Sequence, residues 1–334
     1  MAIAHGERAR APLAPASIKA AAGYSLPTFA AVIWFALGAV TFGWPQAQAW
    51  PYTLAFALGA TGLGLLVLLS ALLAQFWPPL AQRVRTGTPW IALLGGLFLL
   101  WEILTAKLAL LPVPFFQPPQ SLLEVFLEDY QRLGESVLRS VWLLARGYLI
   151  GAVAGVVLGM AMGWSPKVNY WSHPILRFIG PLPATAWLPL AFFIFPTSAS
   201  ASVFLIALAT GFPVAILTWS GVASVSSAYY DIARTLGANS RFLILKVALP
   251  AAMPHIFVGL FMGLGASFAV LVVAEMMGVK AGLGWYLQWA QGWAAYNNMY
   301  AGLLVMALMC SGLVALLFRL RDRLLAWQKG LVRW

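Results

Sequence analysis

The segment Asp231–Pro250, DIARTLGANSRFLILKVALP, interrupts a chain that is otherwise almost entirely apolar. It is polar and basic, and long apolar runs lie before and after it. Asp231 and Ala233 are followed, four residues after Ala233, by Gly237. Glycine suits the end of a helix, so we expect a short helix that ends at Gly237. A second helix should follow and stop near Pro250, because proline blocks helix continuation.

The composition predicts an all-α integral membrane protein. Hydrophobic residues make up 62% of the 334 residues and charged residues only 9%, whereas soluble domains carry about 25% charged residues. A membrane-spanning helix needs about 20 predominantly apolar residues. Eight such runs are present, and they are too long and too little alternating to be strands. We predict spans at about 26–44, 52–76, 90–111, 137–163, 174–195, 200–222, 254–275 and 298–318.

Basic residues are distributed unevenly between the two sides of the predicted membrane. With the N-terminus in the cytoplasm, fifteen Lys and Arg residues fall in cytoplasmic segments and three in outer loops. This positive-inside bias places both termini and Asp231–Pro250 in the cytoplasm. It also explains the net charge of +11 without nucleic acid. The cytoplasmic residues are Arg8, Arg10, Lys19, Arg83, Arg85, Lys167, Arg177, Arg234, Arg241, Lys246, Arg319, Arg321, Arg323, Lys329 and Arg333, and the outer residues are Arg132, Arg139 and Lys280.

The order and spacing within Asp231–Pro250 resemble the coupling loop of permease subunits of bacterial ABC importers. The family pattern is Glu-Ala-Ala, three residues, Gly, nine residues and Ile-x-Leu-Pro. Asp231 stands for Glu, Ile232 for the first Ala and Val247 for Ile, while Gly237 and both gaps fit. The resemblance covers about residues 90–330 and extends to the branch that imports nitrate, sulfonates and taurine. It includes Pro118-Pro119, Ser140 seven residues before Gly147, Pro181-Leu182-Pro183 through Trp187-Leu188-Pro189, and Glu275 to Gly282-Leu283-Gly284.

The resemblance implies a permease that works with partners. It implies two ATPase subunits that bind ATP and Mg²⁺, a second permease copy in a homodimer, and a periplasmic or lipid-tethered substrate-binding protein in the bacterial inner membrane. No phosphate-binding loop is present in the sequence, so the chain itself is not expected to hydrolyse ATP or to bind a cofactor. The coupling residues implied are Asp231, Ala233, Arg234, Gly237, Arg241, Leu249 and Pro250. Arg234 and Arg241 are either contacts for acidic ATPase residues or ordinary positive-inside charge.

Two N-terminal helices are additional to the six-span core that the resemblance implies. We expect a cytoplasmic tail at 1–25, the two additional helices at 26–76, a six-helix core at 90–318 with the coupling loop at 223–253, and a basic tail at 319–334.

The fourth predicted span carries glycines at every fourth position, Gly147, Gly151, Gly155, Gly159 and Gly163. On a helix they form one groove, in which a neighbouring backbone approaches closely. The groove is either static packing or a sliding surface between helices that rock during transport.

Arginines recur every seven residues at the start of this span, at Arg132, Arg139 and Arg146. Arg146 lies about 13 Å into the membrane at 1.5 Å per residue. The three residues are either a ladder that draws a small anion inward, or headgroup contacts for Arg132 and Arg139 with a structural partner for Arg146.

Two carboxylates also lie in or at the edge of the predicted membrane. Glu102 and Lys107, five residues apart, point about 140° away from each other on an α-helix, so we expect no simple pair. Glu102 then needs a partner, for which Arg146 is a candidate, or it contacts substrate. Glu275 ends the seventh span as an interfacial cap or a gate contact.

The sequence shows no spacing for a metal site and no nucleophile–base set. The predicted function is therefore import of a small anion such as nitrate, a sulfonate, taurine or bicarbonate by alternating access. Two alternatives remain: a secondary transporter driven by an ion gradient, which would need more intramembrane carboxylates, and a membrane assembly subunit without transport.

Overall fold

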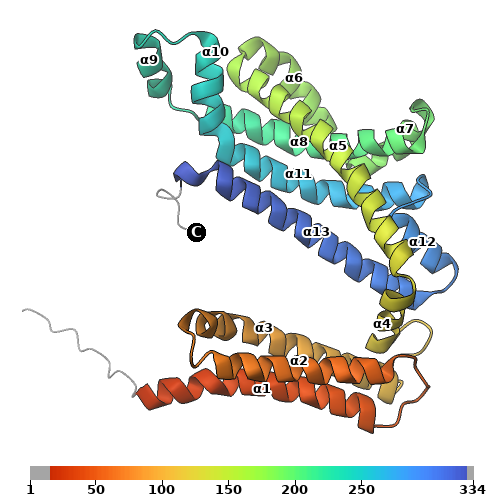
Figure 1. Cartoon of the computed structure of the whole chain (residues 1–334). Coiled ribbons are helices and arrows are strands. Elements are labelled where there is room, and N and C mark those ends of the chain that lie inside the picture. Colours follow the sequence, from red (N-terminus) through yellow and green to blue (C-terminus); the bar gives the residue numbers. More distant parts are fainter. Residues whose placement is uncertain (1–15, 329–334) are drawn as a thin grey trace, which may run out of the picture. The chain divides into compact units, whose positions relative to one another are not determined.

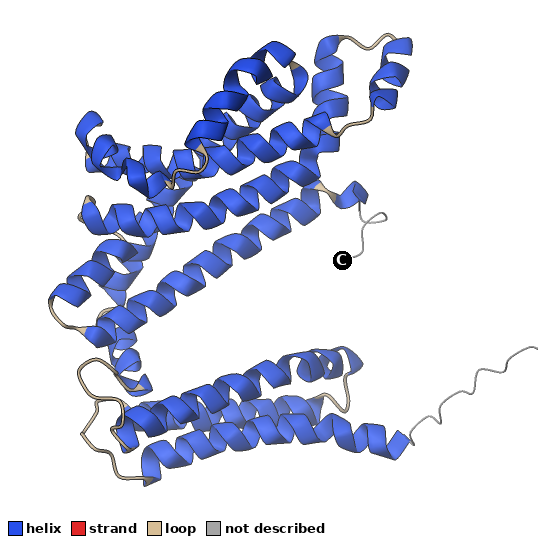
Figure 2. Ribbon diagram, turned by 180° about the vertical axis from the view of Figure 1, so that it is seen from behind, coloured by secondary structure: helices blue, strands red, loops and turns tan. Residues whose placement is uncertain are grey.

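The computed structural model describes residues 16–328, with side chains for residues 26–327, and these residues form helices and no strand (Figure 2). The prediction of an all-α membrane protein is confirmed. Residues 1–15 and 329–334 of the two expected tails lie outside the described residues. The helix α1 begins at Ala16, within the expected N-terminal tail, because the Ala-rich stretch before the first span favours helix.

Seven described helices are long and apolar enough to span a membrane, and a bent pair makes up to eight. The seven are α1 (Ala16–Gly43), α2 (Thr53–Leu73), α3 (Pro78–Glu102) with the π turn η1 (Ile103–Lys107), α5 (Tyr130–Trp164), α8 (Ser198–Ala223), α11 (Leu249–Met277) and α13 (Tyr296–Leu324). The shorter elements are α4 (Pro119–Glu128), α6 (Pro166–Ile179), η2 (Ala184–Trp187), α7 (Leu188–Ile194), α9 (Ser227–Thr235), α10 (Ser240–Phe242), the π turn η3 (Leu243–Ala248), α12 (Leu283–Gly292) and η4 (Ala326–Gln328).

The span expected at 174–195 is not one straight helix. The helix α6 and the continuous turn of η2 and α7 meet at an angle of 87°. Pro181 and Pro183 lie in the short break between them. Proline lacks the N–H group that continues a helix, so two prolines in four residues force the chain to change direction.

The chain forms two compact units, Met1–Glu128 and Asp129–Trp334, called unit 1 and unit 2 here. In unit 1, α1 packs against both α2 and α3. The indole Nε1 of Trp34 donates to the carbonyl oxygen of Ile91 at 3.0 Å and joins α1 to α3. The helix that was expected to open the six-span core, α3, therefore packs with the two helices before it.

In unit 2, α8 lies between α5 and α11 and contacts both extensively (Figure 1). Leu144, Leu205, Ile206, Leu264 and Leu271 form the centre of its apolar core. A polar contact crosses this core, because the buried hydroxyls of Thr210 on α8 and Ser267 on α11 lie 2.6 Å apart. Small polar side chains of this kind hold helices together where lipid supplies no hydrophobic drive.

Five of the six glycines of α5, those at every fourth position from Gly147 to Gly163, face α8. A Cβ atom at Gly155 would lie 2.7 Å from the carbonyl oxygen of Gly211, and one at Gly147 would lie 2.6 Å from the Cβ of Ile206. Gly151, Gly159 and Gly163 are equally close to the backbone or to Cβ atoms of α8. A side chain at any of these positions would force the two helices apart.

We expect Gly155→Ala to lower the free energy of unfolding by about 1–3 kcal/mol, since the added methyl group overpacks the α5–α8 contact. Gly134→Ala, on the same helix, is the matched control, because a Cβ there meets nothing within 4 Å. It should leave stability unchanged or raise it by up to about 1 kcal/mol, as alanine is the better helix former. Unfolding of the purified protein by SDS titration measures both, and equal stability of the two variants would contradict the packing assignment.

Candidate functional site

A buried carboxylate, Glu275, joins three helices at the end of α11. Its Oε1 accepts a hydrogen bond from Ser140 Oγ of α5 at 2.7 Å. Its Oε2 accepts from the backbone N–H of Gly284 at 2.8 Å. Ser140 Oγ in turn accepts from the backbone N–H of Leu283 at 2.8 Å. These contacts, called the Glu275 junction here, fix the start of α12 against α5 and α11.

The glycines of the Gly282-Leu283-Gly284 stretch make this junction possible. Gly282 has φ +107°, a backbone conformation that favours glycine, and a Cβ there would overlap the Glu275 carboxyl group. A Cβ at Gly284 would lie 2.8 Å from the Cβ of Glu275. The carboxylate can therefore reach the N–H of Gly284 in the first turn of α12, where the helix dipole favours negative charge.

A second polar network holds the other side of α12. The buried Tyr286 donates its hydroxyl to Asp129 Oδ2 at 2.7 Å, and Asn298 Nδ2 donates to the Tyr286 hydroxyl, also at 2.7 Å. Burial raises the pKa of the Tyr286 phenol above its ordinary value, so the group stays protonated and acts as a donor. The network joins α12 to Asp129, the residue directly before α5, and to the first turn of α13.

The three arginines of α5 divide between two hollows in unit 2. Arg132 lies 4.6 Å above the Trp289 ring, and Arg139 pairs with Glu135 at 3.3 Å. Both line a hollow of about 230 Å³ at the α12 end of unit 2. Arg146 lies 5.5 Å above the Trp142 ring and lines a separate, mostly apolar hollow of about 730 Å³.

The expectation that Glu102 and Lys107 do not pair is wrong. Lys107 Nζ lies 3.7 Å from Glu102 Oε1, and both side chains are fully buried. The five residues Ile103–Lys107 form a π turn, in which the N–H of Leu108 donates to the carbonyl oxygen of Ile103 at 2.9 Å. Residues five apart lie above one another in this geometry, unlike in an α-helix. Glu102 thus has a cationic partner in its own unit.

Lys107 also caps the C-terminal end of α1. Its Nζ donates to the carbonyl oxygens of Thr41 and Trp44, both at 2.8 Å. Cations at a helix C-terminus satisfy its free carbonyls and complement the dipole. Glu102 and Lys107 therefore have a structural role, which holds α1 to α3.

We expect Lys107→Met to lower the free energy of unfolding by about 3–5 kcal/mol, because it leaves Glu102 buried without a counter-charge. The double variant Glu102→Leu, Lys107→Met should recover part of that loss, since it removes both charges. SDS titration of the two single variants and the double variant measures the coupling. Additive effects would show that the two side chains do not act as a pair.

The helix α9 ends as the sequence predicts. Gly237 has φ +82°, and the N–H groups of Gly237 and Ala238 donate to the carbonyls of Arg234 and Ala233 at 2.9 and 3.0 Å. This pair of hydrogen bonds is the Schellman motif, which needs a left-handed residue and favours glycine.

The second helix does not stop at Pro250. It begins after Asn239, which caps it, and the span runs through Pro250 as Ser240–Met277. The π turn Leu243–Ala248 lies directly before the proline, and the N–H of Leu249 donates to a carbonyl five residues back. The widened turn accommodates a residue that has no N–H group and would crowd the preceding carbonyls. Leu249 and Pro250 thus open α11.

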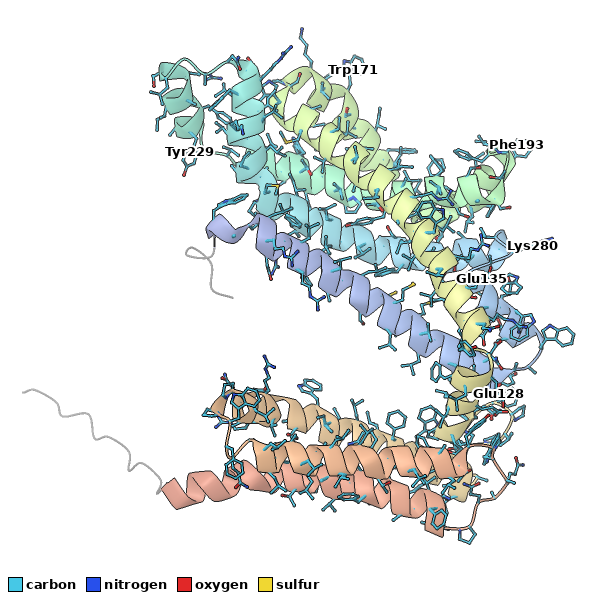
Figure 3. The ribbon with its side chains drawn as sticks, viewed as in Figure 1. Glu128, Glu135, Trp171, Phe193, Tyr229 and Lys280 are labelled. Atoms are coloured by element: carbon cyan, nitrogen blue, oxygen red, sulfur yellow. The ribbon has the colours of Figure 1, made fainter. Side chains whose placement is uncertain are left out.

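Most residues of α9 are exposed, and none of them is buried. Tyr229 and Ile232 on α9 and Leu236 directly after it are each at least 60% exposed and follow helical spacing, so they form one apolar face. Figure 3 shows Tyr229 at this place. Tyr230 points the other way and meets the Trp164 ring edge-on at 5.9 Å. The apolar face of α9, Tyr229, Ile232 and Leu236, has no cover in the described part of the chain.

The charged residues near α9 are also exposed. Arg234 pairs with Asp231 at 3.3 Å, and both side chains are at least 60% exposed. Arg241 lies on the surface of α10. All three charged groups are accessible to a partner.

Sequence reasoning missed several residues of the α12 networks. Asp129, Tyr286 and Asn298 come from distant segments and follow no periodic pattern. Of these networks, only the stretch from Glu275 to Gly284 was recognisable in the sequence, through the family resemblance. Lys280, counted as an outer-loop charge, lines the same hollow as Arg132 and Arg139.

We expect Ser140→Ala to loosen the start of α12, because it leaves the Leu283 N–H without an acceptor and removes a donor to Glu275. Loss of about 1–3 kcal/mol of local stability should speed hydrogen–deuterium exchange of residues 283–284 about tenfold. Ser220→Ala, at an exposed serine of α8, should leave that exchange unchanged. If Ser140→Ala also had no effect, the junction would not be what fixes α12.

Comparisons with known proteins place the chain among transport permeases. Residues 151–329 match the family described as binding-protein-dependent transport system inner membrane component. The chain is 27% identical to the nitrate import permease of Synechococcus elongatus, over 75% of this chain and 91% of that protein. It is 33% identical to the taurine transport system permease of Escherichia coli, over 75% and 92% of the two chains.

Similarity extends to other transport proteins. The chain is 32% identical to a putative aliphatic sulfonates transport permease of Bacillus subtilis, over 57% of this chain and 69% of that one. A solved inward-facing structure of a methionine ABC transporter aligns with 62% of this chain and 99% of that chain at 18% identity and a TM-score of 0.47.

The helices, the family match and the relatives define a multi-pass permease of the inner membrane. The chain belongs to the family of binding-protein-dependent transport system inner membrane components. It is thus an ABC permease, and its relatives are transport permeases.

Proposed function

We propose that the chain is the membrane subunit of an ATP-driven importer of a small anion. Its relatives are named for nitrate, bicarbonate, aliphatic sulfonates and taurine. Each of these compounds contains a small, negatively charged oxyanion group: nitrate, bicarbonate or a sulfonate. The basic residues Arg132, Arg139 and Lys280 around one hollow support a substrate of this kind.

The exposed apolar face of α9 carries the proposal that the chain works with an ATPase. Exposed apolar faces at helical spacing commonly dock into a groove of a partner, and Tyr229, Ile232 and Leu236 form such a face. The excess of Lys and Arg in the same segments supports a cytoplasmic position for Asp231–Pro250 and for both termini. On the cytoplasmic side the partner would be an ATPase, which binds ATP and Mg²⁺.

The complete importer would contain two ATPase subunits, a homodimer of this chain and a periplasmic or lipid-tethered binding protein. Closure of the ATPases on ATP would move the two docked α9 helices and switch the permease between inward-facing and outward-facing states. We place Arg139 and Glu275 on the anion's route at the α12 end of unit 2, and Arg146 further along α5.

We expect Ile232→Asp combined with Leu236→Asp to abolish co-purification with the ATPase encoded beside this chain, because it places two charges in the apolar face. Gly237→Val should lower uptake at least tenfold, since a β-branched residue is strained at φ +82°. Ser227→Asp, at the start of the same helix, should leave both properties unchanged. Co-purification and uptake in reconstituted vesicles are the measurements.

Membrane insertion of every variant is the control. Normal association of the doubly charged variant with the ATPase would contradict the docking role of α9. Normal uptake by inserted Gly237→Val would contradict the coupling role of the Asp231–Pro250 segment.

A further inference from the structure

The small hollow at the α12 end of unit 2 is built from two separate segments. Arg132, Glu135, Ser136 and Arg139 come from α5, whereas Lys280, Ala281, Gly282 and Trp285 come from the stretch between α11 and α12 and from α12 itself. Its volume is about 230 Å³. Figure 3 shows Glu135 and Lys280 in this part of unit 2.

Positive charge exceeds negative charge around the hollow. Three basic side chains line it, and Glu135 is the one carboxylate among the lining residues. Glu135 is already paired with Arg139 at 3.3 Å, and Asp129 lies 3.7 Å from Arg132. Among the ion pairs within residues 26–327, none includes Lys280. A cation without a carboxylate partner therefore faces a polar hollow.

We propose that this hollow binds the headgroup of a singly charged oxyanion, with Lys280 as the main charge that recognises it. The guanidinium groups of Arg132 and Arg139 offer planar pairs of N–H donors that match two oxygens of such a group. The lysine adds a compact charge with three donors, and Ser136 adds a hydroxyl. This assignment rests on the proposed import of a small anion. It names Lys280 as the residue that makes the hollow prefer a negatively charged ligand to a neutral one.

The N-terminus of α12 is not part of this site. Its first N–H groups, those of Leu283 and Gly284, already donate to Ser140 and Glu275. The anion must therefore be held by side chains of the hollow. Gly282 lies both in the lining and against the Glu275 carboxyl group, so the bound anion would sit directly beside the Glu275 junction.

Equilibrium binding to the purified chain in lipid nanodiscs tests the site without any partner. Sodium nitrate, sodium bicarbonate and sodium methanesulfonate are titrated by calorimetry at low ionic strength. We expect the wild-type chain to bind at least one of them, more weakly as salt is added, because exposed charges are screened. Lys280→Gln should weaken binding at least about fivefold, and Lys280→Arg, which keeps the charge, should stay within about twofold.

Arg177→Gln removes one exposed positive charge from α6, away from the hollow, and should leave binding unchanged. Absence of binding by the wild-type chain, or equal binding by Lys280→Gln and wild type, would overturn the site. An equal loss in Arg177→Gln would overturn it too, since the effect would then be one of net charge.

Failure of the importer proposal gives a different result. Binding that depends on Lys280, with no anion-stimulated ATP hydrolysis in the full complex, would leave the site in place and contradict import. Anion-stimulated hydrolysis with unchanged binding by Lys280→Gln would contradict the site and leave import in place.

Discussion

Close packing of α5 on α8 sets the positions of the other helices in unit 2. Apolar helices gain nothing from water exclusion inside a membrane, so their association depends on close backbone approach and on a few polar contacts. Gly155 of α5 meets the carbonyl of Gly211, and on the opposite contact Gly263 of α11 would place a Cβ 3.0 Å from the carbonyl of Thr210. Small residues lie at the contact of α8 with α5 and at its contact with α11, so α8 fixes the positions of both helices.

The Glu275 junction depends on that packing. Ser140 and Glu275 are 135 residues apart, and only the placement of α5 and α11 against α8 brings them within 2.7 Å. A buried carboxylate is costly unless it is hydrogen-bonded, and here the donors are the Ser140 hydroxyl and the N–H of Gly284 at the start of α12. The position of α12, and with it the basic hollow lined by Lys280, thus follows from helix packing that begins with glycines on α5.

Local chemistry was predictable from the sequence, whereas register and tertiary contacts were not. The helical fold followed from composition, and the end of α9 followed from the conformational freedom of Gly237. The wrong expectations for the Glu102–Lys107 pair and for Pro250 have one cause, since each lies at a π turn that adds a residue to the helical register. Periodicity of the α-helix does not reveal such turns. The Asp129–Tyr286–Asn298 network was invisible because it exists only once α5, α12 and α13 are assembled.

The two ends of unit 2 differ in how firmly they are held. At one end α12 is fixed by the Glu275 junction and by Tyr286, whereas at the other end α9 leaves its apolar face open and meets the helices through Tyr230. A single continuous helical segment, Ser240–Met277, runs between these ends, and Glu275 lies roughly 50 Å along it at 1.5 Å per residue. Residues 236–239 join α9 to this segment, so displacement of α9 by a partner would reach the Glu275 junction through that short turn and one helix. The π turn Leu243–Ala248 lies near the α9 end of that helix. If the helix bends when α9 moves, we expect the bend at this turn.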